Sequence, residues 1–560
     1  MSGKEEPMGN RRFQAGVLLA IGLVAVVTPV LSATYSQDQL IEDVRQLTTI
    51  IEASHPDPFL RCGGRIAFYR IVDATLNAIP KEGMTKEEFV RLLRPLIATI
   101  GDAHTQIWST YRTSDFYPGG IPLRFSVVGT SLYVTHMKRK DERLHGARLI
   151  SVQGCTLPEL MALQRTLVGL ENDYEVLLRL SDQSLWYAPY LAELLPDWTD
   201  HSRITVKLHL ATGEIETVTF ELPVKSSLLL GQSSSVGIPE ANSAGFGWGF
   251  MDVAELEDPI CYLRIDHQGM LREFREENRA VGAEPMTPAQ LASIPSATGE
   301  FRDMVVAMAE ARTDTLIIDL RYNSGGTDTM ADILVYFLYG HDGLISYRTD
   351  MLRHSGGSVM RYSALHFENC PDQSIEDVNA RVGGVSMQVG DYDFSEDTRG
   401  RENEVQALLE SIDPISYLEE GYRNAATFYE EFMTGTYAGY YVPERVVVLV
   451  TPKTFSAGST TMRALDINGA TLIGTPSGQS MNAFGNGTLW KLGNTGVHGC
   501  MSRSYHEPYA DDPELGHVWP VDVQMTYDLL ASYAFDPNAE LLLALDWLRS
   551  ALSNPKQEAE

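Results

Sequence analysis

The sequence predicts an α/β protein with a helical N-terminal unit and a small mixed domain ahead of its main core. Continuous apolar runs at 315–320 and 445–450 are typical of buried parallel strands. Helical patterns follow them at 329–338 and 456–467, which is the alternation expected of crossover connections. The length of 560 residues exceeds what one core usually holds, so we expect two or three domains.

The helical unit is expected over 34–119. Apolar residues recur with helical spacing over 38–54, and a second helix is expected over 66–79. Thr85 is followed three residues later by Glu88, the pattern of a capping box that begins a third helix.

The small mixed domain is expected over 120–225, because short alternating strands begin there. The expected strands are 123–128, 132–136, 147–152, 203–210 and 214–222. A stretch rich in Leu, Tyr and Trp over 174–198 is expected to be helical. The Ser- and Gly-rich interval 226–245 is expected to be a linker or a mobile loop.

The main core is expected over 246–550, with a short tail at 551–560. Further elements predicted within it are a strand at 260–265, a helix at 299–312 and a strand at 470–473. The interval 355–430 is acidic and has no strong period, so it is expected to be an insertion.

The first 33 residues stand apart in composition. Lys4, Arg11 and Arg12 precede an uncharged run over 13–30, and small residues follow it. This order is typical of an export signal, which predicts a secreted or periplasmic protein. The apolar run approaches the length of a membrane span, so a retained N-terminal anchor is the alternative.

Charge and cysteine usage exclude some function classes. The formal net charge of −30 repels nucleic acid and anionic lipid, so neither is expected as a main partner. The five cysteines are scattered without metal-type spacing, and most are expected to be free thiols.

The first candidate for chemistry is Ser456, which directly follows a buried strand and begins a helix. Unpaired backbone N–H groups at a helix start suit a developing oxyanion. The structural alternative is that Ser456 is simply a good N-cap. Ser459 is a second candidate nucleophile, although it lies one turn inside the predicted helix.

Two further features carry possible chemistry. A buried strand ends in the glycine pair Gly325 and Gly326, which lets backbone N–H groups approach a substrate closely. A tight turn is the structural alternative, and a phosphate loop is not supported because no Gly-Lys-Ser/Thr ending follows. His104 lies in a short turn after a helix, two residues beyond Asp102.

Taken together, these segments resemble the C-terminal processing (tail-specific) serine peptidase superfamily over most of the chain. The matching segments are HPDPF at 55–59, GDAHT at 101–105, DLRYNSGG at 319–326, TFSAG at 454–458 and LIGTPSG at 472–478. The resemblance implies a ClpP/crotonase-like α/β catalytic core. It also implies that the small mixed domain is a PDZ-like α+β module.

The superfamily has two catalytic versions, and the resemblance favours the tricorn-core-like Ser/His/Glu branch. The lysine of the Ser-Lys version is replaced by Asn486, which leaves only Lys491 at a shifted position. In the other branch the resemblance assigns the histidine to His104 and the glutamate to Glu514, with Glu507 as the alternative acid.

The resemblance then implies a mechanism without metal or cofactor. Ser456 is the expected nucleophile and His104 its base, with the N–H of Ala457 and of Gly325 or Gly326 as the oxyanion hole. Protein or peptide is the expected substrate. A non-catalytic binding protein for peptide or hydrophobic ligand is the alternative function, and an esterase-like hydrolase is a third. Peptide binding by the PDZ-like module stays open.

Overall fold

The computed structural model describes residues 34–553, apart from several internal intervals. Those are 109–118, 223–228, 231–233, 243–244, 255, 257, 269–270, 278–285, 355, 372, 383–385, 396–406, 408–418, 420–421 and 436–440. The predicted signal or anchor at 1–33 lies outside the described residues. Among the helices that are described, none has the length and apolar character needed to cross a membrane.

A six-stranded sheet forms the centre of the main core, which confirms the predicted α/β class. Its strand order is β11-β12-β13-β16-β17-β20, and every neighbouring pair is parallel except β11 with β12. The strands are β11 (Phe246–Met251), β12 (Ile260–Ile265), β13 (Thr315–Asp319), β16 (Arg445–Val450), β17 (Thr471–Gly474) and β20 (Val523–Gln524).

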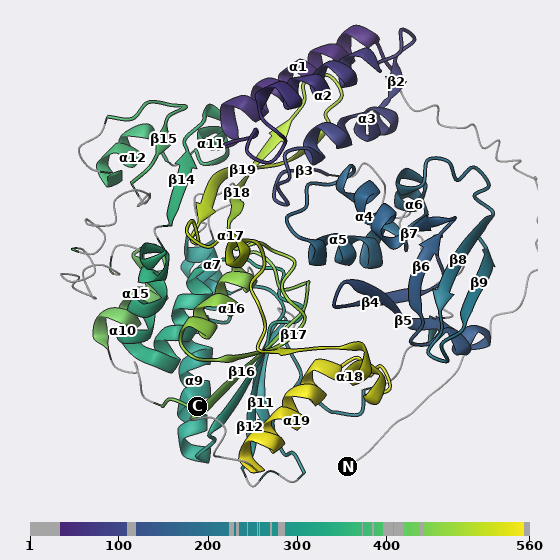
Figure 1. The fold of residues 1–560 in the computed structure, drawn as a ribbon. Coiled ribbons are helices and arrows are strands. Elements are labelled where there is room, and N and C mark those ends of the chain that lie inside the picture. Colours follow the sequence, from purple (N-terminus) through teal and green to yellow (C-terminus); the bar gives the residue numbers. More distant parts are fainter. Residues whose placement is uncertain are drawn as a thin grey trace, which may run out of the picture.

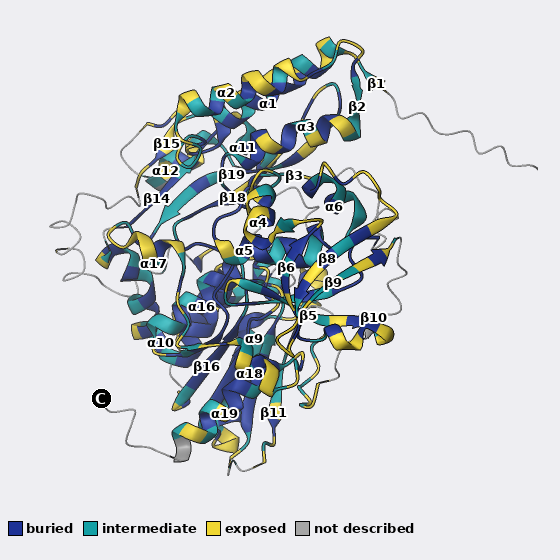
Figure 2. Cartoon of the chain, turned by 45° about the vertical axis from the view of Figure 1, so that its right-hand side comes forward, coloured by how far each residue is buried: buried dark blue, intermediate teal, exposed yellow. Residues whose placement is uncertain are grey.

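Helices cover both faces of this sheet, because successive strand residues point to opposite sides. Leu316 and Ile318 pack in one apolar cluster with helices α9, α10 and α16, whereas Ile317 packs in another with α19. Figure 2 shows the central strands almost wholly buried between these layers. The helices are α9 (Ala297–Ala311), α10 (Thr329–Arg353, kinked at Gly340), α16 (Ala457–Ile467) and α19 (Ala539–Ser553).

The N-terminal unit is helical as predicted, and it packs on a hairpin from the main core. The expected capping box forms, since the Thr85 and Glu88 side chains each bond the other's backbone N–H. The apolar cluster of this unit also contains Trp490 and Met501, from strands β18 and β19 (Figure 1). The elements are α1 (Gln37–Ser54), α2 (Arg65–Asn77), α3 (Lys86–Ala98), β18 (Ala483–Lys491) and β19 (His498–Glu507).

The interval 355–430 is more than an insertion lying outside the core. Its strand β14 (Gly357–Arg361) pairs antiparallel with β19 and so extends the β18–β19 sheet. The short strand β3 (Gln106–Ile107), which follows the His104 turn, pairs with the same β19. One sheet therefore joins the N-terminal unit, the interval 355–430 and the main core.

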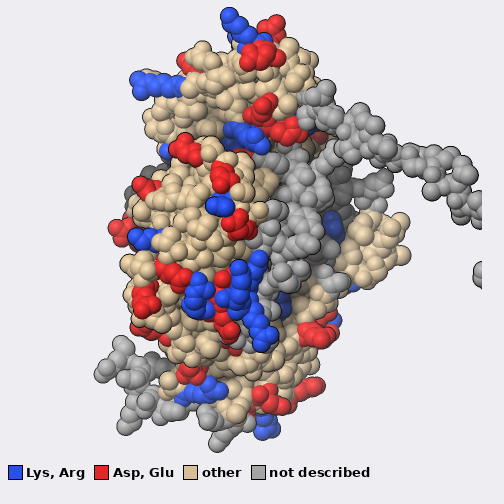
Figure 3. Space-filling view, turned by 90° about the vertical axis from the view of Figure 1, so that its right-hand side faces the viewer, with Lys and Arg blue, Asp and Glu red and all other residues tan. Residues whose placement is uncertain are grey.

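The small mixed domain has its own sheet and its own apolar core. Its main elements are β4 (Arg124–Val128), β5 (Ser131–Lys138), β6 (Arg148–Val152), α4 (Leu157–Arg165), α5 (Asp173–Arg179), α6 (Ala188–Leu194), β8 (Arg203–His209) and β9 (Ile215–Glu221). Strands β8 and β9 form the predicted hairpin. On the face shown in Figure 3, acidic and basic side chains are interspersed.

All five cysteines are free thiols, with Cys261 and Cys370 buried and the other three half-buried.

A buried ion pair anchors the strand end that leads to the glycine pair. Arg321 binds Asp319 through two nitrogens, at 2.7 and 2.9 Å, and also contacts Asn538 at 2.9 Å. Both ion-pair side chains are almost completely buried. Burial alone would raise the pKa of Asp319, but the guanidinium charge and hydrogen bonds of Arg321 lower it.

Removing the guanidinium of Arg321 is expected to lower the stability of the fold strongly. Arg321→Met leaves the Asp319 charge buried, so the free energy of unfolding in urea should fall by about 3–5 kcal/mol. Arg264→Met is the matched control, because Arg264 also binds a carboxylate two residues away but at a half-exposed site. That change should cost about 0–1 kcal/mol. Equal losses in the two variants would contradict the argument.

Candidate active site

Ser456 lies at the junction between β16 and α16, in a backbone conformation that few side chains adopt. Its φ is 53° and its ψ is −129°, and it directly precedes the first residue of the helix. A positive φ at a residue other than glycine stores strain, and such strain concentrates at functional sites. Hydrogen bonds hold the turn: Phe455 N donates to Asn323 O at 2.9 Å, and the Thr454 hydroxyl donates to Leu320 O at 2.8 Å.

The glycine pair lies directly against this turn. A Cβ at Gly325 would stand 2.6 Å from the Cβ of Ser456, and its φ of +101° also favours glycine. The Gly325 N–H already donates to Asn323 Oδ1 at 2.9 Å. Among the described residues the N–H groups of Gly326 and Ala457 have no protein acceptor, so these two are the available oxyanion donors.

His104 meets Ser456, although 352 residues separate them in the sequence. The distance from His104 Nε2 to Ser456 Oγ is 3.3 Å, and the His104 ring stacks on Phe455 with centroids 5.3 Å apart. Burial lowers the pKa of His104, which favours the neutral ring that can accept a proton.

Asp102 fixes the backbone of the His104 turn rather than the ring. Its Oδ1 accepts from His104 N at 2.8 Å, while its Oδ2 accepts from the Thr105 hydroxyl and contacts His55 Nε2 at 3.1 Å. Burial would raise the pKa of Asp102, but its bond to His55 and the neighbouring charges lower it.

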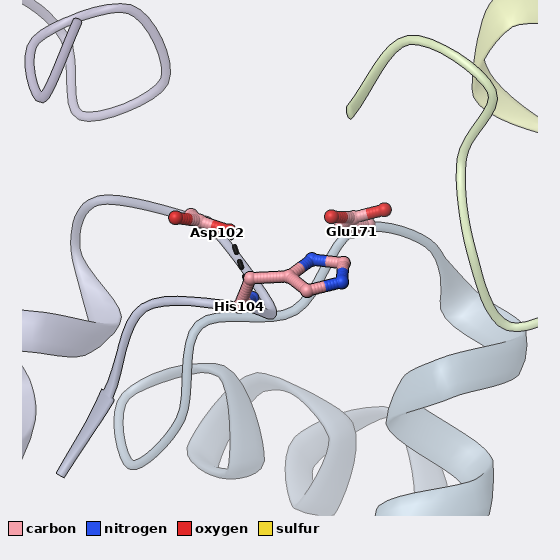
Figure 4. A group of neighbouring side chains, drawn as sticks. All are labelled: Asp102, His104 and Glu171. Atoms are coloured by element: carbon pink, nitrogen blue, oxygen red, sulfur yellow. Dashed lines mark hydrogen bonds between the residues drawn. The ribbon is translucent and has the colours of Figure 1, made fainter. Parts of the chain in front are cut away.

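A second carboxylate, Glu171, lies beside the His104 ring. Figure 4 shows it near the ring edge that carries Nδ1. Facing atoms of Asp102, His104 and Glu171 all lie within 4.8 Å of one another. Glu171 precedes α5 in the small mixed domain and is 6% exposed.

The two acids expected from the resemblance lie elsewhere. Glu514 is exposed in the first turn of the short helix α17 (Pro513–His517), and no described hydrogen bond joins its side chain to His104. Glu507 ends β19, where its carboxylate accepts from the Tyr505 hydroxyl at 3.4 Å. The structure therefore brings Ser456, His104 and the glycine pair together but leaves Glu514 on the surface.

These groups open into a cleft of about 760 Å³. His104, Ser456, Ala457 and Gly326 are among the residues that line it. The cleft continues along residues 483–489 of β18, so it is long enough for more than one side chain of an extended peptide.

A sequence model of peptidase family S41 matches residues 261–488, which contain both the glycine pair and Ser456. Over this segment, about two fifths of its length, the chain is similar to peptidases of family S41. The match supports a serine-type peptidase, and a protease acts on protein or peptide. No curated protein matches the chain.

Several solved structures resemble this chain at low identity. Mature CPAF complexed with lactacystin is 12% identical at a TM-score of 0.48, covering 92% of this chain and 98% of that one. The photosystem II D1 C-terminal processing protease is 13% identical at 0.36, covering 89% and 95%. A putative S41 protease from Bacteroides fragilis NCTC 9343 is 12% identical at 0.30, covering 78% and 84%. The similarity to family S41 rests on the sequence match.

The Ser-Lys alternative has no support among the described residues of the cleft. Asn486 lines the cleft, and its side-chain nitrogen donates to Ser504 Oγ at 2.8 Å. Lys491 lies at the far end of β18, paired in register with His498, and it is exposed.

Sequence reasoning missed Glu171, His55 and Gln479 as parts of the site. The Gln479 side-chain oxygen accepts the Ser456 N–H, and His55 bonds Asp102. His55 stands in the matched segment HPDPF, which was a usable signal. Glu171 follows a plain Gly-Leu pair and carries no motif that could have indicated its position.

Adding one methyl group at Gly325 should disrupt the nucleophile. Gly325→Ala places a Cβ against Ser456, so kcat/KM should fall by at least about 100-fold, because small misplacements of reacting groups are costly. Gly390→Ala is the matched control, since Gly390 has a φ of +102° but nothing within 4 Å of an added Cβ. The control carries the same backbone strain and should keep its rate. An unchanged rate in Gly325→Ala, measured on a fluorogenic peptide, would contradict this packing.

Proposed function

We propose that the chain is a serine endopeptidase in which Ser456 is the nucleophile and His104 its general base. The contact of 3.3 Å between His104 Nε2 and Ser456 Oγ carries this proposal. The positive φ of Ser456 supports it, because a merely structural N-cap does not require a strained backbone.

The chemistry follows the Ser-His pattern. Ser456 Oγ attacks the carbonyl carbon of the scissile peptide bond while its proton passes to His104 Nε2. The carbonyl oxygen becomes an oxyanion, which the N–H groups of Gly326 and Ala457 stabilise at the positive end of α16. His104 then gives the proton to the leaving amine. Water attacks the acyl-enzyme by the same route, which releases the acid product and restores Ser456.

Asp102 contributes by holding the turn in which His104 sits. Its three contacts fix the backbone of residue 104 and the side chain of Thr105. Since both Asp102 oxygens are engaged there, the His104 ring needs another carboxylate to complete a triad. Glu514, which the resemblance indicates, is exposed and unsuited to that role in this conformation.

The nucleophile assignment is tested by replacing each of two nearby serines with alanine in separate variants. Ser456→Ala should abolish labelling by a fluorophosphonate probe and reduce kcat by about 10⁴-fold or more, since a triad without its nucleophile loses most of its rate. Ser459→Ala is the control: the Ser459 hydroxyl is buried, at 3.1 Å from Thr454 O and 2.8 Å from Ser477 Oγ. Labelling that survives the first change and disappears with the second would reverse the assignment.

We also propose that the peptidase is exported from the cytoplasm by its N-terminal segment. The basic residues before the apolar run over 13–30 support this, together with the small residues after it.

Export predicts a defined new N-terminus. N-terminal sequencing of protein purified from its native source should begin near residue 33 or 34, in a fraction outside the cytoplasm. A chain that begins at Met1 in the membrane fraction would show a retained anchor instead.

A further inference from the structure

We propose that Glu171 is the positioning carboxylate of the active site, and that it accepts a hydrogen bond from His104 Nδ1. The inference rests on the proposed roles of Ser456 and His104. It assigns the carboxylate of the triad to the small mixed domain, in place of the exposed Glu514.

Two buried atoms without partners carry the inference. Within the described residues, neither His104 Nδ1 nor Glu171 Oε1 has a hydrogen-bond partner, although both are inaccessible to solvent. A buried polar atom left unpaired is unfavourable, because it has lost its water without gaining a partner. The two are complementary, since one can donate and the other can accept a hydrogen bond. Figure 4 shows the Glu171 carboxylate facing the His104 ring, and one of its oxygens lies within 4.8 Å of a ring nitrogen. A movement of one side chain toward the other by about 2 Å or less would bring the two atoms within hydrogen-bond distance. Hydrogen bonds between catalytic groups are often long before substrate binds.

The other groups near the ring are already engaged. Asp102 uses one oxygen for His104 N and the other for His55 and Thr105. The Phe484 backbone also favours a protonated His104, but it does not meet hydrogen-bond geometry with Nδ1, which has no partner among the described residues. Glu171 is the carboxylate that remains.

Glu171 is itself held in place by the loop that follows β17. Its Oε2 accepts from Ser480 N at 3.0 Å, and Ser480 directly follows Gln479, which binds the N–H of Ser456. The neighbouring Asn172 donates from its side chain to Ser477 O at 3.1 Å. One loop therefore contacts both the nucleophile turn and the carboxylate.

The tight approach of two backbones fixes the distance from Glu171 to His104. A Cβ at Gly169 would lie 2.4 Å from the carbonyl oxygen of Asp102. The segment before Glu171 thus packs directly on the turn that carries His104, and only glycine fits there.

The charges around the pair give it a measurable titration. Burial raises the pKa of Glu171 well above its ordinary value; Glu175 and Asp102 also raise it, whereas Arg61 and the Ser480 N–H lower it. Burial likewise raises the pKa of Glu175 to about 7, with Arg179 acting against it. The charges facing His104 are Asp102, Asp328 and Arg179.

These shifts have a definite sign. Only ionised Glu171 stabilises the imidazolium, so activity should fall as pH drops through the raised pKa of the His104–Glu171 pair. Removing the carboxylate also removes a charge that favours imidazolium. The acid limb of kcat/KM should therefore move to lower pH when Glu171 is replaced.

Stability should move in the opposite direction from activity. A carboxyl whose folded pKa is raised destabilises the fold increasingly as pH rises through the interval between its unfolded and folded pKa values. Glu171→Gln removes that cost. Its melting temperature at pH 8 should equal or exceed that of the unsubstituted protein.

The experiment compares four variants of the full chain. Glu171→Gln should lower kcat by about 10²–10⁴-fold, as other triads do without their acid, and should shift the acid limb. Glu171→Asp should recover part of the rate. Glu276→Gln removes another buried glutamate, one that caps Thr427, and should keep its rate and profile. Glu514→Gln tests the rival acid.

A readout other than catalysis separates this inference from the proposed function. At pH 8 the unsubstituted protein should show a far-downfield proton resonance from His104 Nδ1–H, assigned by its absence in His104→Gln. That resonance should disappear in Glu171→Gln, whatever reaction the enzyme performs. If it persists there, or if Glu514→Gln alone carries the loss of rate and the shifted acid limb, Glu171 is not the positioning residue. Loss of the resonance in an enzyme that cleaves no peptide would contradict only the proposed function.

Discussion

The site depends on the parallel pairing of β13 with β16, which sets two chain reversals side by side. Parallel strands end at the same edge of a sheet, so the glycine pair and the nucleophile turn leave the sheet as neighbours. Beyond the last paired residues the contact continues, because the Thr451 hydroxyl donates to Arg321 O at 2.6 Å and Phe455 N donates to Asn323 O at 2.9 Å. This seam holds Ser456 at its positive φ and keeps Gly326 N–H beside it.

At that edge of the sheet, each unit of the chain contributes different residues to the site. The main core contributes Ser456 and the N–H groups of Gly326 and Ala457, and the N-terminal unit contributes His104 through a turn that Asp102 closes. The small mixed domain contacts both through the segment at 169–175. Arg61 joins the first two units, since its guanidinium binds Gly101 O at 2.8 Å and Asn482 O at 2.6 Å. No unit contains a complete site, so the geometry of catalysis depends on how the three are docked.

The sequence was sufficient to predict the parts of the fold that depend on local patterns. Apolar runs identified β13 and β16, and the capping box at Thr85 located the start of α3. It also selected Ser456 and His104, because each lies in a segment of recognisable order. The strand β14 was missed, since its pairing with β19 is a long-range contact that leaves no periodic signal in so short an element. Glu171 was missed for a related reason: its position depends on docking between domains.

Burial explains why an acid at Glu171 suits the chemistry better than one at Glu514. A solvated carboxylate interacts with an imidazolium through a high dielectric, which weakens the attraction severalfold relative to a buried pair. Burial strengthens that attraction but raises the cost of the isolated charge, so the fold bears an ionisable group it would not select for stability alone. The two adjoining glutamates, Glu171 and Glu175, increase this cost, and Arg61 and Arg179 offset only part of it. Two buried glutamates beside His104 lower the stability of the fold, and such a loss is expected at a site where the charge is needed for reactivity.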